Sequence, residues 1–91
     1  MYKGYKIILY QVKGNNYINF QSLNDHKNWV SKIIEINNKY IVSCSSDQSI
    51  IFYYKYYKYR ILHRLSTNGI CHSMTKIKEN EICYLETIIL L

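Results

Sequence analysis

Apolar runs of strand length recur along this chain with a period of 40–43 residues, and this repeat constrains the fold more than any other feature. Residues 7–10 (IILY) match residues 50–53 (IIFY) at an offset of 43. Residues 17–23 share their apolar framework with residues 59–65 at an offset of 42, and three further pairs follow at offsets of 40 or 41. A repeat of this length indicates a unit of secondary structure that stacks on its neighbours to bury a core.

Each repeat contains short segments that end at polar or glycine-containing turns. The expected strands cover residues 7–12, 17–23, 29–36, 40–45, 49–54, 59–65, 70–77, 81–85 and 87–91. Residues 13–16 (KGNN) predict a four-residue hairpin connection, and residues 37–39 predict a tight turn. Several short strands at regular spacing are typical of sandwiches, barrels and propellers, and no segment indicates a helix. The sequence therefore predicts an all-β fold.

The segment from Asp25 to Tyr54 has a specific order of polar residues. Asp25-His26 precedes a hydrophobic run that begins at Trp29, and the turn SCSSD at residues 43–47 precedes a strand that ends in Tyr53-Tyr54. This order resembles a blade of the WD40-repeat β-propeller family, which has Gly-His, a strand, Ser-x-Ser-x-Asp, and a strand ending in Trp-Asp. Blades of this family have four strands and repeat about every 40–45 residues. Here Asp25 replaces the glycine, and two tyrosines replace Trp-Asp.

The resemblance implies a partial WD40-type β-propeller with four-stranded antiparallel blades. Residues 1–23 would be the end of one blade, residues 24–65 the central blade, and residues 66–91 a degenerate or truncated following blade. In this last blade Asn68 stands where the histidine would be, and the turn aspartate is missing. Because propellers close with four to eight blades, we expect a fragment, a truncated product, or self-association through open blade edges.

The resemblance also implies a structural hydrogen-bond network made of His26, Ser43, Asp47 and Tyr53. A buried histidine needs partners at both ring nitrogens. The Asp47 carboxylate can orient one nitrogen, and the Ser43 hydroxyl can accept from the other. Tyr53 would use its hydroxyl where the family has an indole N–H. The same residue types occur in hydrolase triads, but no G-x-S-x-G nucleophile motif is present.

The loops that carry the histidine and the turn aspartate form the face on which WD40 proteins bind peptides or protein domains. By this resemblance, Lys27, Asn28 and Trp29 are the candidate partner-binding residues, and an exposed Trp29 would be a natural anchor. No glycine-rich phosphate loop is present, and the six carboxylates are scattered. We therefore expect a non-catalytic interaction scaffold without a cofactor.

Basic charge leaves a second function open. The formal net charge is +6, and residues 53–60 (YYKYYKYR) interleave aromatic and basic side chains. Such a stretch can stack bases and neutralise phosphates, so the alternative is a small nucleic-acid-binding protein. In the blade interpretation the same residues are a strand and its turn. Steep salt dependence would distinguish phosphate binding from peptide recognition.

Cysteine usage and hydropathy suggest the compartment. The three cysteines form no C-x-x-C pair, and the spacing of His63, Cys71 and His72 matches no usual zinc pattern. No window approaches the ~18 apolar residues of a membrane helix, and no secretory signal follows the first residues. We expect an intracellular, cytoplasmic protein that binds neither a metal nor a membrane.

Overall fold

The computed structural model describes residues 6–67, 69, 74–78, 81–84 and 87–90, and this part of the chain forms nine β-strands without a helix. The strands are β1 (Ile7–Lys13), β2 (Asn16–Leu23), β3 (Val30–Asn37), β4 (Tyr40–Ser45), β5 (Ser49–Tyr56), β6 (Lys58–Ser66), β7 (Thr75–Lys78), β8 (Glu81–Tyr84) and β9 (Thr87–Leu90). All pairings are antiparallel. The prediction of an all-β, antiparallel fold is confirmed.

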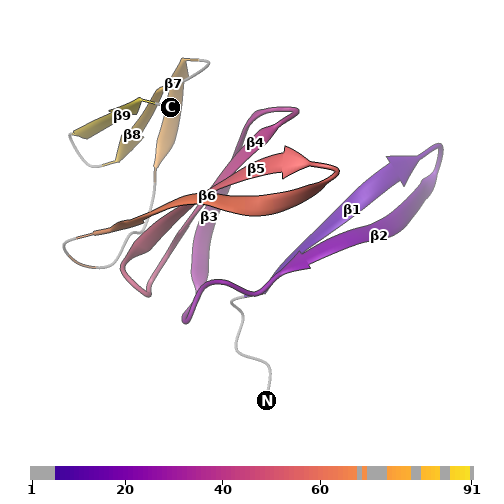
Figure 1. The fold of residues 1–91 in the computed structure, drawn as a ribbon, viewed down its shortest axis with the longest axis horizontal. Helices are drawn as coiled ribbons and strands as arrows, with labels where there is room; N and C mark the ends of the chain where they lie inside the picture. Colours follow the sequence, from indigo (N-terminus) through magenta and orange to yellow (C-terminus); the bar gives the residue numbers. More distant parts are fainter. Residues whose placement is uncertain (1–5, 68, 70–73, 79–80, 85–86, 91) are drawn as a thin grey trace.

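The strands form three sheets, and each strand pairs with its neighbour in the sequence. A two-stranded sheet contains β1 and β2, a four-stranded central sheet has the order β3-β4-β5-β6, and a three-stranded sheet has the order β7-β8-β9. The β1–β2 hairpin lies on one side of the central sheet and the β7–β9 sheet on the other (Figure 1). The chain is therefore a succession of antiparallel sheets joined by local connections.

Both faces of the central sheet are covered. Alternate residues of β4 and β5 point to opposite faces, so each strand contributes residues to two hydrophobic clusters, one on each face of the sheet. One cluster joins the central sheet to β7–β9 and contains Ile36, Val42, Cys44, Ile50, Phe52, Met74 and Ile82. The other joins it to the hairpin and contains Ile7, Leu23, Ile41, Ile51 and Tyr53. Burial on both faces explains why residues 50–53 are continuously apolar, instead of alternating with polar residues.

Two turns are tighter than the sequence indicates. Lys13 pairs with Asn16, so two residues connect β1 to β2 and not four. Gly14 has a φ of 60°, which glycine adopts without the steric penalty of a Cβ atom. Residues 55–58 were expected to be a connection, but β5 and β6 pair as far as Tyr56 and Lys58. Tyr57 alone makes this turn, with a φ of 65°.

Part of the expected third blade lies outside the described residues. This holds for Asn68, for Cys71 and His72, and for residues 85–86, where the turn aspartate is missing. In the described ranges, no helix is long and apolar enough to cross a membrane.

Candidate protein-interaction surface

His26 lies in the loop between β2 and β3, beneath the turn that joins β4 to β5, and only 2% of its surface is exposed. Its Nδ1 is 3.1 Å from Asp47 Oδ2, and its Nε2 is 2.6 Å from Ser43 Oγ. An ionised carboxylate can only accept, so the geometry assigns the proton to Nδ1. Nε2 forms its hydrogen bond with the Ser43 hydroxyl, so both nitrogens of the buried ring have a partner, as expected for a buried histidine.

Asp47 is the centre of this network and binds two further donors. The Ser49 hydroxyl donates to Asp47 Oδ1 at 2.5 Å, and the Lys27 backbone N–H donates to Oδ2 at 2.8 Å. Burial of the carboxyl raises its pKa, but these hydrogen bonds and the one from His26 outweigh burial and lower the pKa to about 2. Asp47 therefore stays ionised at neutral pH and continues to accept from all three groups.

Tyr53 makes a contact with Asp25 that the WD40 pattern does not suggest. Its side chain is fully buried, and its hydroxyl donates to Asp25 Oδ2 at 3.0 Å. Burial raises the Tyr53 pKa, the hydrogen bond to Asp25 raises it further, and a hydrogen bond with Ser43 acts in the opposite direction. Arg64 Nη2 donates to the Asp25 carbonyl oxygen at 3.3 Å.

Two members of the network were missed by the sequence interpretation. Asp25 was identified only as a replacement for glycine, and Ser49 was given no role. The departures from the WD40 pattern at Asp25 and Tyr53 are partners in the fold, because the Tyr53 hydroxyl donates to the carboxylate of Asp25, the residue next to His26. The sequence signal for this contact is that Asp25 and Tyr53 both depart from the WD40 pattern.

The order Ser43–His26–Asp47 has the hydrogen-bond connectivity of a hydrolase triad. Ser43 is completely buried, however, so no substrate carbonyl can contact its Oγ in this fold. In the described part of the chain, every buried side-chain nitrogen or oxygen has a hydrogen-bond partner. The arrangement satisfies polar groups between strands and holds the loop above them in place.

That loop contains the three candidate partner-binding residues, Lys27, Asn28 and Trp29, and is called the Trp29 loop below. The backbone N–H of Ser46 donates to the Trp29 carbonyl oxygen at 2.9 Å. The Ser45 hydroxyl donates to the Asn28 carbonyl oxygen at 3.1 Å, and Asn28 Oδ1 accepts from the Trp29 N–H at 2.8 Å. The backbone of the loop is therefore fixed to the β4–β5 turn.

Trp29 is exposed, although its backbone is held. The exposed fraction of Trp29 is 57%, which is high for tryptophan, the largest of the amino-acid side chains. Lys27 and Asn28 beside it are also exposed. The strand expected to begin at Trp29 begins at Val30. The Trp29 ring thus projects from a rigid position at the edge of the central sheet, where it can contact another molecule.

The basic and aromatic residues 53–60 are divided by the fold. Tyr53 is buried, Tyr59 is half-buried, and the Tyr54 ring packs 5.2 Å from the ring of Tyr40. Tyr56 and Tyr57 are exposed, and their rings lie 4.8 Å apart in an edge-to-face arrangement at the β5–β6 turn. The stretch therefore presents two exposed aromatic rings and not a continuous stacking surface.

Among the described residues, no group of three His, Cys, Asp or Glu side chains could hold a metal ion. Neither a scan against protein-family models nor a search of curated proteins finds a match for this chain. The WD40 resemblance consequently depends on the residues and the geometry given above.

Proposed function

We propose that this chain is a non-catalytic protein–protein interaction scaffold, built as part of a WD40-type β-propeller, and that the Trp29 loop contacts the partner. The observation that carries the proposal is an exposed Trp29 on a backbone tied to the β4–β5 turn. Tryptophan is enriched among the residues that dominate binding energy. A loop that is ordered before binding loses little entropy when the partner arrives.

The propeller part of the proposal rests on two features. The His26, Ser43 and Asp47 side chains meet in the order in which a WD40 blade uses them. The three sheets also pack face to face through apolar clusters on both sides of the central sheet, as the blades of a propeller do. The net charge of +6 favours partners with acidic segments, since opposite charge accelerates encounter.

The test uses peptides selected from a random display library against the complete wild-type chain. Their affinity is then measured for wild type, Trp29→Ala and the control Tyr57→Ala, which removes an even more exposed aromatic ring at the other end of the sheet. We expect Trp29→Ala to weaken binding by at least about 30-fold, the loss typical of a central aromatic anchor. Equal binding by Trp29→Ala and wild type would contradict the proposed surface.

The alternative, nucleic-acid binding through residues 53–60, is supported by the exposed pair Tyr56 and Tyr57 and by the neighbouring Lys58. Titration with single-stranded oligonucleotides at low and moderate salt distinguishes the two functions. Phosphate binding weakens steeply as salt rises, whereas peptide recognition changes much less. Tight, strongly salt-dependent binding that is lost in Tyr57→Ala would favour the alternative.

Self-association is part of the scaffold proposal, with a second copy of this chain as the occupant. The β1–β2 hairpin exposes Tyr10, Val12 and Tyr17 by 56%, 63% and 75%. Val12 and Tyr17 are cross-strand partners, so their side chains share one face of the hairpin. Sheets of the same chain already cover both faces of the central sheet, so a sheet from a second copy is a suitable cover. Light scattering should give a smaller mass for Tyr17→Lys than for wild type; equal monomeric masses would exclude this contact.

A further inference from the structure

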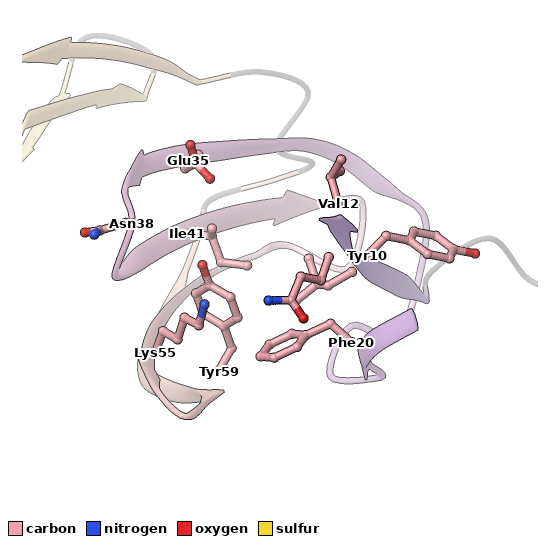
Figure 2. A pocket seen from close by; sticks show the side chains of 10 residues that line it. Tyr10, Val12, Phe20, Glu35, Asn38, Ile41, Lys55 and Tyr59 are labelled. Atoms are coloured by element: carbon pink, nitrogen blue, oxygen red, sulfur yellow. The ribbon is translucent and has the colours of Figure 1, made fainter. Parts of the chain in front are cut away.

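A cavity of about 330 Å³ lies between the β1–β2 hairpin and the central sheet (Figure 2). Its lining residues are Leu9, Tyr10, Gln11, Val12, Phe20, Glu35, Asn38, Ile41, Lys55 and Tyr59. Asn38 lies in the β3–β4 turn, and Lys55 lies near the β5–β6 turn. In an antiparallel sheet these turns are at the end opposite the β4–β5 turn, so the cavity is separate from the Trp29 loop.

The inner wall of the cavity is apolar and aromatic. Ile41 is buried, Leu9 is half-buried, and the rings of Phe20 and Tyr59 face the same space (Figure 2). Phe20 reaches it because the pairing shifts between Leu9 and Tyr10, where β2 contains one extra residue. A bulge of this kind redirects a side chain at the point where a sheet approaches a ligand.

Lys55 supplies the positive charge of the cavity. Its Nζ is 5.0 Å from the centroid of the Phe20 ring and 5.9 Å from that of Tyr59. At these distances the aromatic rings attract the ammonium group by cation–π interactions, but they carry no net charge, so the group keeps its positive charge. The one carboxylate in the lining belongs to Glu35, and no ion pair joins Glu35 to Lys55 within the described ranges. The ammonium group can therefore accept an incoming anion.

We propose that this cavity binds a monocarboxylate with an apolar body. The carboxylate pairs with Lys55 Nζ, and the apolar body packs against Phe20 and Ile41. A volume of about 330 Å³ is at the lower end of the range for small-molecule sites, so the body is about the size of one phenyl or branched aliphatic group. Glu35 at the rim repels a second negative charge, which disfavours dicarboxylates.

Two sources offer this chemistry: a free apolar carboxylic acid, and the C-terminus of a peptide that ends in an apolar residue. The experiment titrates the complete ¹⁵N-labelled chain with 3-phenylpropionate and follows backbone amide shifts. A second titration uses a short neutral peptide that ends in Phe with a free carboxylate. The matched neutral probes are 3-phenylpropanol and the same peptide with an amidated C-terminus. Both titrations are repeated with Lys55→Gln and with the control Lys32→Gln, which removes an exposed lysine of β3 outside the cavity lining.

We expect shifts that cluster at Leu9, Phe20, Ile41 and Tyr59 with the carboxylate probes. Binding should weaken at least about tenfold for the neutral probes and for Lys55→Gln, the loss expected for one charge-assisted hydrogen bond, and should be unchanged for Lys32→Gln. The more tightly bound carboxylate probe identifies the source. The proposal is overturned if neither carboxylate shifts these residues, or if the neutral probes or Lys55→Gln bind equally well. Because Lys55 is exposed, its substitution does not threaten the fold, and dispersion of the amide spectrum checks this.

Discussion

The Gln21 side chain binds both backbone polar groups of Tyr59, a residue 38 positions further along the chain. Gln21 Nε2 donates to the Tyr59 carbonyl oxygen at 2.7 Å, and Gln21 Oε1 accepts from the Tyr59 N–H at 2.7 Å. A side-chain amide has the donor and acceptor of a peptide group, so Gln21 pairs with β6 as a neighbouring strand would. This contact joins the hairpin to the central sheet at Tyr59, which lines the cavity beside Lys55.

Gln21→Glu should loosen the hairpin without unfolding the central sheet. A carboxylate retains the acceptor for the Tyr59 N–H but loses the donor, so two acceptors then face each other. We expect faster amide hydrogen exchange across β1 and β2, with little change in β4 and β5. Asn19→Asp is the matched control, since it adds the same charge at an exposed position of the same strand. Equal exchange in the two variants would mean that Gln21 does not hold the hairpin.

Ser43→Ala should destabilise the fold by about 1–3 kcal/mol, because it leaves Nε2 of the buried His26 without its partner. Urea unfolding measures the change. Ser31→Ala, at an exposed position of β3, should stay within about 0.5 kcal/mol of wild type. If both variants were equally stable, the network would not support the sheet.

The stability of the chain should fall in acid through Asp47. Its folded-state pKa of about 2 is below the ordinary value of 3.8, so the unfolded chain binds the proton first. The stabilisation is fully present above pH 3.8 and is lost as pH falls towards 2. The shift corresponds to roughly 2 kcal/mol for this nearly buried carboxylate.

Urea unfolding at several pH values tests this contribution. Asp47→Asn, which cannot ionise, should be less stable than wild type at neutral pH and should show a smaller loss in acid. A wild-type stability that is constant between pH 4 and pH 2, or an identical acid loss in Asp47→Asn, would refute the assignment.

Tyr53→Phe should cost about 2 kcal/mol, since the ring remains packed and the hydroxyl's hydrogen bonds with the Asp25 carboxylate and with Ser43 are lost. Tyr57→Phe removes a hydroxyl from a ring that is 82% exposed and should change stability by less than about 0.5 kcal/mol. The comparison by thermal or urea unfolding isolates the buried hydroxyl. A neutral Tyr53→Phe would show that the Asp25–Tyr53 contact is unimportant.

The sequence was sufficient to predict the local features of the fold. Period-two and continuous apolar runs located the nine strands, because strand burial depends on local patterning. The identity and order of His26, Ser43 and Asp47 singled out residues that the fold brings together. Strand ends differed by a few residues, most clearly at Tyr57, where cross-strand pairing overrides a polar composition.

The Asp25–Tyr53 contact and the cavity could not be predicted, because they depend on tertiary contacts that a single sequence does not reveal. The Asp25–Tyr53 bond joins two departures from the WD40 pattern that the sequence resembles, and each departure alone looks like the loss of a hydrogen-bonding residue. The cavity combines Phe20 with Lys55 and Tyr59, which become neighbours only after a bulge in β2 and the packing of the hairpin on the sheet. Neither kind of contact leaves a periodic signal.

The central claim is that separate sheets of one chain stack face to face, as the proposed propeller arrangement requires. Nuclear Overhauser contacts in a mixture of isotope-labelled and unlabelled chain test it directly. On one face of the central sheet we predict intramolecular contacts from the Met74 methyl group to Ile50 and Phe52. On the other face we predict contacts from Leu23 to Ile51 and Tyr53. Absence of both sets, or contacts only between different molecules, would contradict the stacked arrangement.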